Sequence, residues 1–216
     1  MKHEIKAICT GTARPFNGTE ASAIAKRPRE GLVQLLEDGF APDEQADRRV
    51  HGGPEKAVHL YPLDHHDFWR EFLDGKAGNA ALLDQPGAFG SNLAVSELSE
   101  TEVHIGDRFR LGSAVIEIKQ PRQPCWKVDH RFEAKGMTAA IVKTGRSGWY
   151  FRVLEIGEVQ AGDALERIET GHTDWSVARV FACLIAGKAT QEELTQLAVL
   201  DRLAPTLQER AKAKLA

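Results

Sequence analysis

The sequence predicts a mainly β protein, a closed or partly open β-barrel with a few helices, followed by a small three-helix domain. Short apolar or alternating runs, separated by turn-forming residues, fill about two thirds of the chain. No strand–helix–strand unit repeats among them, and nothing suggests two matched sheets. After Glu169 the apolar spacing becomes that of helices, so we divide the chain into 1–168 and 169–216.

The N-terminal part contains three predicted strands. Ile5 to Thr10 alternates with period two, and apolar runs follow at 31–36 and 57–61. Pro62 ends the third run and starts a helix. One face of that helix carries His65, His66, Trp69, Phe72 and Leu73. The stretch from 74 to 90 is rich in Gly, Asp and Pro and predicts a loop.

Strands resume after Asn92. The runs 109–111 and 116–118 alternate on either side of Gly112-Ser113, which predicts a hairpin. Further strands are predicted over 149–156 and 164–168, with a short helix between them over 137–144.

The last part predicts three helices. The first ends at Gly187 and has an apolar stripe of Val177, Val180, Phe181, Leu184 and Ile185. Thr190 and Glu193 form a capping box for the second, and Pro205 opens the third. Three short helices bury little core alone, so we expect them to dock on the barrel or on a second copy, and we expect a homodimer.

Composition narrows the classes of function. Lys and Arg total 28 against 31 Asp and Glu, a net charge of -3, which disfavours binding to nucleic acid or to an anionic membrane. No apolar run approaches the roughly 20 residues that span a bilayer. The first residues lack a basic segment followed by an apolar one. The three cysteines are far apart and odd in number, which argues against a disulfide scaffold. We therefore expect a cytoplasmic protein.

The segment 120–129, QPRQPCWKVD, presents a candidate reactive cysteine. Its two prolines constrain the backbone around Cys125, and Arg122 and Lys127 place positive charge near the sulfur. Nearby cations favour the nucleophilic, metal-binding thiolate. The alternative is a small buried side chain in a proline-rich loop. A structural role is expected for the other cysteines, Cys9 and Cys183.

The segment 47–57, DRRVHGGPEKA, predicts an anion site. Its Gly-Gly-Pro turn allows backbone N–H groups to approach an anion closely, and Arg49, His51 and Lys56 surround it. A second basic cluster begins at Lys26. Arg and Lys side chains match phosphate oxygens well. The alternative is a turn whose charges are simply solvated.

Several other kinds of site are disfavoured. The chain has no Walker A sequence and no GxGxxG after a strand. Its histidines fit no HExxH or paired-cysteine zinc pattern. It also lacks the GxSxG of a serine hydrolase.

Four stretches together resemble the MOSC family, the domain found in molybdenum cofactor sulfurases. They are DRRVHGGPEKAVHLYPLDHHDFW (47–69), GAFGSNLAVSEL (87–98), HIGDRFRLGSAVIEIKQPRQPCWKVDHRF (104–132) and GWYFRVLEIGEVQAGD (148–163). The resemblance is strongest to its bacterial 6-N-hydroxylaminopurine resistance branch, which carries a similar three-helix extension. One departure is Ser91, where the family usually has Glu. A carboxylate proposed there for proton delivery or cofactor contact is therefore absent.

The resemblance implies a barrel with Cys125 at the mouth of a basic pocket that binds the molybdenum cofactor, a pterin with a dithiolene and a phosphate tail. Cys125 would be the protein thiolate on molybdenum. The phosphate and pterin would be held by Lys26, Arg49, His51, Lys56, Asn92, Arg122 and Lys127. At the level of the whole family, pyridoxal phosphate binding is also associated with this domain.

The implied reaction is reduction of an N–OH group to N–H, with 6-hydroxylaminopurine as an example of the substrate. His51 is the candidate proton donor because its unperturbed pKa lies near neutrality. No second redox motif is present, so a separate flavin-type reductase would supply electrons. Trp126 or Trp149 could stack on the base. Two alternatives remain: a sulfur or cofactor carrier with a persulfide on Cys125, and a phosphoanion-binding module with a structural Cys125.

Overall fold

A nine-stranded sheet forms the centre of the molecule. The computed structural model describes residues 1–46 and 52–215. In sheet order the strands are β1 (Lys2–Glu4), β14 (Ala164–Glu169), β10 (Arg108–Leu111), β11 (Ala114–Pro121), β12 (Trp149–Glu155), β8 (Val58–Pro62), β9 (Leu93–Val95), β2 (Ala7–Thr10) and β5 (Arg27–Pro28). Neighbouring strands are antiparallel except β8 and β9, which are parallel.

The order of the strands shows that this sheet curls into a partly open barrel. β1 stands at one edge, and β2, only a few residues later in the chain, lies next to the other edge. The short link between them changes partner within two residues: Ile5 donates to the Asp163 carbonyl beside β14, and Lys6 to the Ala94 carbonyl of β9. The two ends of the sheet are therefore close together, as the barrel prediction requires.

Two small sheets flank the barrel. One has the order β13 (Gly157–Val159), β6 (Val33–Leu36) and β7 (Gly39–Phe40). The other is a hairpin of β3 (Arg14–Asn17) and β4 (Glu20–Ser22).

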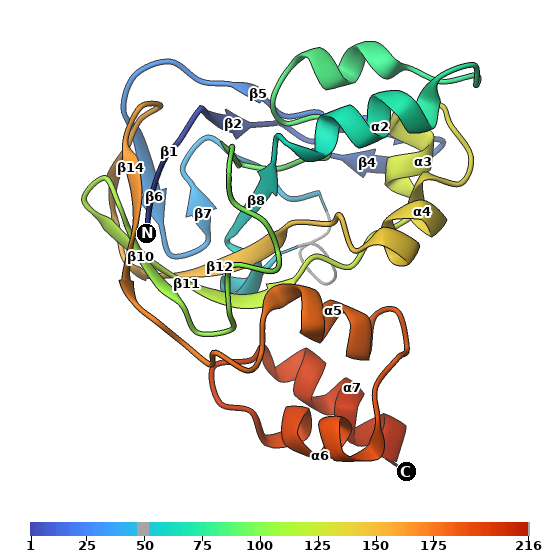
Figure 1. The fold of residues 1–216 in the computed structure, drawn as a ribbon. Helices are drawn as coiled ribbons and strands as arrows, with labels where there is room; N and C mark the ends of the chain where they lie inside the picture. The colour runs from blue at the N-terminus through green and yellow to red at the C-terminus, as the bar shows by residue number, and fades with distance from the viewer. Residues whose placement is uncertain (47–51, 216) are drawn as a thin grey trace.

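The helices form two groups (Figure 1). The first is α2 (His65–Leu73), α3 (Lys127–Arg131) and α4 (Met137–Thr144), with the short 3-10 turn η2 (Ala80–Asp84) against α2. The second is α5 (Val177–Leu184), α6 (Gln191–Val199) and α7 (Pro205–Leu215). The 3-10 turn η1 (Pro54–Lys56) lies apart from both groups, against β12 and β11. Among the described residues, none of these helices has the length and apolar character needed to cross a membrane.

The C-terminal helices dock on the barrel of the same chain. Their apolar side chains, including Val180, Leu197 and Leu207, belong to the same buried cluster as the barrel residues Phe109 and Phe151. A second cluster lies under α2, α3 and α4 and includes Trp69, Phe89 and Phe132. Of the two docking modes expected from sequence, packing on the barrel is the one that this structure contains.

Most predicted elements are present, with corrected boundaries. The run from Ile5 to Thr10 is not one strand, because the chain changes partner at Ile5 and Lys6. Pro62 ends β8 but does not start α2, which begins at His65. The predicted loop from 74 to 90 contains η2. The capping box of Thr190 and Glu193 is confirmed.

Candidate functional site

Six of the predicted site residues line one pocket. About 690 Å³ of space, including its open mouth, lies between the loop before β5, the end of η1, the start of β9, the loop after β11 and β12. The predicted residues in its wall are Lys26, Lys56, Asn92, Arg122, Cys125 and Lys127. Two others, Arg49 and His51, lie outside the described residues.

Cys125 is held at this pocket with its thiol accessible. β11 ends at Pro121, whose missing N–H is tolerated at a strand end, and α3 begins two residues after the cysteine. The Cys125 carbonyl accepts hydrogen bonds from the Val128 N–H at 3.1 Å and the Thr138 hydroxyl at 3.2 Å. Cys125 is a free, half-buried cysteine. Its backbone is therefore fixed, and the residue lines the pocket.

The other two cysteines are structural, as the sequence predicts. Cys9 is fully buried, and burial raises the pKa of its thiol to about 12. Cys183 is 3% exposed, and burial raises its pKa to about 11. Both therefore stay protonated at neutral pH.

Arg122 is the most distinctive cation of the pocket. It is 5% exposed, and its Nη1 is buried without a hydrogen-bond partner among the described residues. Its backbone is anchored, because its N–H donates to the Gly148 carbonyl at 3.0 Å and its carbonyl accepts from the Ser147 hydroxyl. Buried guanidinium groups are normally paired. The free N–H is therefore a donor positioned for an anionic ligand in the pocket.

His59 lies beside Arg122 in the pocket wall. It is 3% exposed, and burial, together with the charge of Arg122, lowers its pKa to about 3. Its imidazole is therefore neutral near pH 7. The His59 Nε2 lies 3.3 Å from the Ser147 carbonyl, so in that tautomer it donates a hydrogen bond there.

Lys26 and Asn92 are engaged inside the protein. The Lys26 ammonium forms a buried ion pair with Asp43, and burial lowers the pKa of Lys26 while Asp43 opposes that shift. Asp43 also accepts from the Asn92 side chain and the Gly11 N–H, both at 2.8 Å. The second amide hydrogen of Asn92 goes to the Cys9 carbonyl, and its oxygen accepts from the His59 N–H. These two residues therefore shape one wall of the pocket.

Asp43 is the main site residue that sequence analysis missed. It supplies a buried carboxylate in the pocket wall, whereas Ser91 is 2% exposed and supplies none. No motif surrounds Asp43, and its partners Lys26 and Asn92 are far from it in sequence. Only the fold brings them together.

The remaining predicted cations lie at the edges of the pocket. Lys56 ends η1, which follows Gly53 with φ of 89°, a left-handed conformation that favours glycine. Lys127 starts α3, is 6% exposed, and donates to the Ala21 carbonyl at 3.4 Å. Among the residues that the structure describes, the pocket lining contains four cationic side chains against the two carboxylates of Asp43 and Glu44, which gives this site a positive character. Lys26 pairs with Asp43, and Lys127 lies 4.0 Å from Glu20.

Trp126 and Trp149, the two candidates for stacking on a base, have different environments. Trp149 is fully buried in the barrel core, whereas Trp126, next to Cys125, is 41% exposed. The Trp126 ring lies 6.0 Å from Phe16 of the β3–β4 hairpin and 5.9 Å from His130. Trp126 is therefore the one of the two that is available to a ligand ring.

No group of three or more histidines, cysteines or carboxylates in the described ranges is arranged to hold a metal ion directly.

Residues 47–166 match the MOSC domain family. The chain is 46% identical over 156 residues to the uncharacterized protein YflK of Bacillus subtilis, which covers 72% of this chain and 67% of YflK. It is 39% identical over 162 residues to the protein YiiM of Escherichia coli, covering 74% and 70%. It is also 35% identical over 204 residues to a reductase of Gibberella moniliformis, covering 92% of this chain but only 35% of that protein.

Solved structures extend the similarity to the whole chain. The crystal structure of YiiM from Geobacillus stearothermophilus superposes with a TM-score of 0.82 at 27% identity, covering 99% of this chain and 100% of that one. YiiM from Escherichia coli gives a TM-score of 0.81 at 26% identity, covering 100% and 92%. The similarity therefore includes the C-terminal helices.

Proposed function

Because this chain belongs to the MOSC domain family, in the hydroxylaminopurine resistance branch with YiiM and YflK, we propose that it binds the molybdenum cofactor and reduces N-hydroxylated bases to their amino forms. The observation that supports this most strongly is the pocket itself. An accessible Cys125 thiol shares it with Arg122, whose buried N–H has no partner among the described residues. Such a reaction would remove toxic base analogues.

The residues present fit the cofactor. Cys125 would ligate molybdenum through its sulfur. Arg122, Lys127 and Lys56 would hold the phosphate and the polar edge of the pterin, because their side chains line the same space. Lys26 and Asn92 would shape the wall behind them. When bound, molybdenum supplies the two-electron redox chemistry that no side chain here supplies alone.

The reaction balances as R–NH–OH + 2 e⁻ + 2 H⁺ → R–NH₂ + H₂O. The N–O bond breaks, and the two protons complete the amine and the water. His59 is neutral at pH 7 because its pKa is about 3, so it carries no acidic imidazolium proton to deliver there. We propose His51, which lies outside the described residues, as the proton donor, because the unperturbed pKa of histidine lies near neutrality.

Trp126 would orient the base. Its ring is partly exposed beside Cys125, and indole stacks well on planar heterocycles. We predict that Trp126→Ala raises the KM for 6-hydroxylaminopurine roughly three- to tenfold with a smaller change in kcat, since a stacking contact is worth about 1 kcal/mol. Trp126→Phe retains most of the affinity. Equal KM values for wild type and Trp126→Ala would remove Trp126 from the substrate site.

Electrons would come from a separate flavin-type reductase. The sequence shows no second redox motif. The Gibberella moniliformis reductase is compatible with this proposal, because the region similar to this chain is 35% of its length. The remainder leaves room for an electron-supplying part in the same polypeptide.

We further propose that the protein is a cytoplasmic homodimer. Exposed apolar side chains that could support self-association include Val199 at the end of α6, which is 77% exposed. Light scattering at micromolar concentration gives twice the chain mass if this is correct. A monomeric mass excludes the homodimer.

The proposed activity is tested with protein purified from cells that make the cofactor. With a flavin reductase and NADH, the wild type converts 6-hydroxylaminopurine to adenine, and Cys125→Ser does not. Protein from cells unable to make the cofactor is also inactive. Sulfane sulfur on Cys125 without molybdenum would instead identify a sulfur carrier. Resistance to hydroxylaminopurine that survives Cys125→Ala would identify a phosphoanion-binding module.

A further inference from the structure

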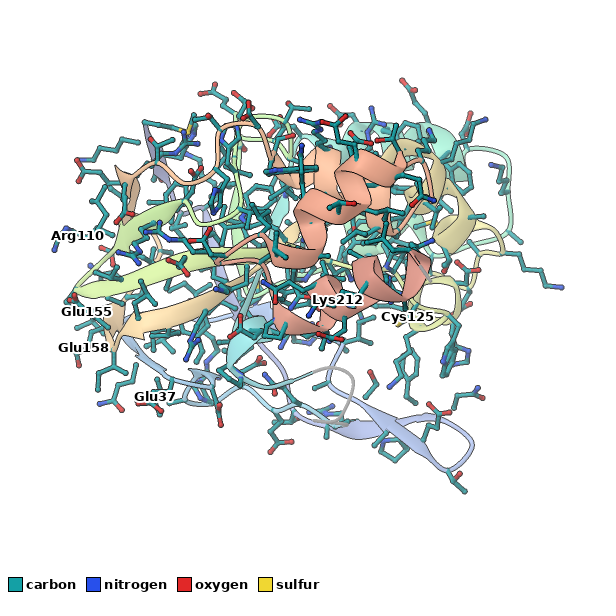
Figure 2. The ribbon with its side chains drawn as sticks, turned by 90° about the horizontal axis from the view of Figure 1, so that it is seen from below. Glu37, Arg110, Cys125, Glu155, Glu158 and Lys212 are labelled. Atoms are coloured by element: carbon teal, nitrogen blue, oxygen red, sulfur yellow. The ribbon has the colours of Figure 1, made fainter. Side chains whose placement is uncertain are left out.

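The C-terminal helix α7 lies against the strand that leads to Cys125. The Ala204 N–H, just before α7, donates to the Lys119 carbonyl of β11 at 3.1 Å. Leu207 and Ala211 are buried in the core that α7 shares with the barrel. Seen from below, the C-terminal helices lie across the strands and extend toward Cys125 (Figure 2).

One side chain of α7 reaches the cysteine loop. Arg210 is three residues after Leu207 and one before Ala211, so it lies at the flank of the buried face. Its Nη2 donates to the Gln123 Oε1 at 2.6 Å. Gln123 lines the pocket and precedes Cys125 by two residues. Arg210 therefore contacts the wall of the pocket from outside the barrel.

The charge of Arg210 also reaches the pocket. Lys56 lines the same pocket, and its pKa is lowered. Burial is the larger cause, and the positive charge of Arg210 is the second. Arg210 forms no ion pair with a carboxylate of the described residues, in contrast to Arg202 and Arg179 of the same C-terminal region. Its guanidinium has donors beyond the one given to Gln123.

We propose that Arg210 is part of the anion-binding rim of the Cys125 pocket and contacts the phosphate of a bound phosphoester. The C-terminal helices would then contribute directly to the site. Arg210 would add its cationic side chain to those of Arg122, Lys56 and Lys127 at this pocket. This proposal rests on the proposed function at one point only, where the bound phosphoester is taken to be the phosphate tail of the cofactor.

The test uses the metal-free full-length protein and two probes, phenyl phosphate and inorganic phosphate, in calorimetric titrations at low ionic strength. Arg210→Gln binds phenyl phosphate roughly three- to tenfold more weakly than wild type, since one partly exposed charged contact is worth about 1 kcal/mol. Arg210→Lys retains most of the affinity because it keeps the charge. Raising the salt concentration reduces the difference.

Lys212→Gln is the matched control. Lys212 is on the same helix and is paired with Glu209 at 2.7 Å, so its loss removes the same charge without changing phosphate binding. Thermal unfolding confirms that the variants are folded. Equal affinity of Arg210→Gln and wild type overturns the proposal, as does failure of wild type to bind phenyl phosphate. An effect on inorganic phosphate alone overturns the phosphoester assignment.

Protein made in cells that lack the molybdenum cofactor separates this inference from the proposed function. If Arg210 acts as proposed, Arg210→Gln weakens phenyl phosphate binding by the same factor in this cofactor-free protein, which has no reductase activity. Absence of molybdenum or of reductase activity in protein from cofactor-competent cells leaves that comparison unchanged. Failure of the reductase proposal is therefore visible separately from failure of the anion rim.

Discussion

At the scale of single residues, the cationic side chains of the pocket differ in whether the protein supplies their partners. Lys26 is neutralised by Asp43, which also ties it to Asn92 and to the backbone. Arg122 is 5% exposed, and one of its nitrogens lacks a partner among the described residues. Burying an unpaired charged donor costs several kcal/mol unless a ligand satisfies it. This difference makes Arg122 the better candidate for contact with an anion.

His59 gives a pH dependence whose sign follows from its pKa. The folded value is about 3 and the unfolded value about 6.5, so the unfolded chain binds more protons between them. The contribution of His59 to stability is complete above about pH 6.5 and is lost as the pH falls toward 3. As the pH is lowered from about 6.5 toward 3, the free energy of unfolding should fall more steeply in wild type than in His59→Gln. The two slopes should differ by up to about 1.4 kcal/mol per pH unit.

Urea unfolding of both proteins at about pH 4.5 and about pH 7 measures this difference. Other groups that titrate in acid are common to the two proteins, so they cancel in the comparison. Parallel curves for wild type and His59→Gln would show that His59 gains a proton as easily in the folded protein as in the unfolded chain.

At the scale of elements, one buried carboxylate holds the start of β12 beside the cysteine loop. The Glu100 Oε1 accepts from the N–H groups of Ser147 and Gly148 at 3.0 and 2.8 Å, and its Oε2 pairs with His65 at 2.8 Å. Gly148 has φ of 71°, and a Cβ there would lie 2.2 Å from the Leu60 carbonyl. Ser147 and Gly148 in turn bond the backbone of Arg122.

Glu100→Ala should destabilise the protein by about 2–4 kcal/mol, because it leaves two buried N–H groups without their acceptor. It should also weaken phosphate binding at the pocket, since the Arg122 backbone loses its support. Chemical denaturation and calorimetric titration measure the two effects. The exposed Glu30→Ala is the control and should change neither. A loss of less than about 0.5 kcal/mol would contradict a structural role for Glu100.

The elements that were predicted from sequence are those with a clear apolar period. β12 has buried Trp149, Phe151 and Val153 in alternation, and α5 has a buried stripe, so local pattern and final burial agree. The β3–β4 hairpin was missed because most of its side chains are exposed and no alternation marks it. Pro121 closes β11 although it has no N–H, because a strand end needs no further donor there.

The candidate site was predictable only in part. Cys125, Arg122 and Lys127 belong to one short motif, so the sequence alone places them together. Asp43 and Arg210 act through contacts across the fold, with Lys26 and with Gln123. Local patterns contain no information about such pairs, because the barrel and the docked helices create them.

At the scale of the whole molecule, the barrel and the C-terminal helices share one core. Leu197 of α6 is fully buried in the cluster that also contains Phe109 of β10. Leu197→Ala should therefore lower the stability of the entire chain by about 2–5 kcal/mol in one cooperative transition. Helix content by far-UV and barrel packing by near-UV circular dichroism should be lost together. Separate transitions, with only the helices destabilised, would show that 169–216 folds as an independent unit.

We propose that the sulfur of Cys125 binds molybdenum within a cationic pocket. The most direct test is to measure the molybdenum content of the purified protein. Wild type, Cys125→Ser and the buried control Cys183→Ser are each made in cells with and without a working molybdenum cofactor pathway. We predict near-stoichiometric molybdenum in wild type and Cys183→Ser from competent cells, and none in Cys125→Ser or in cells without the pathway. Molybdenum at the wild-type level in Cys125→Ser, or none in wild type from competent cells, would contradict the claim.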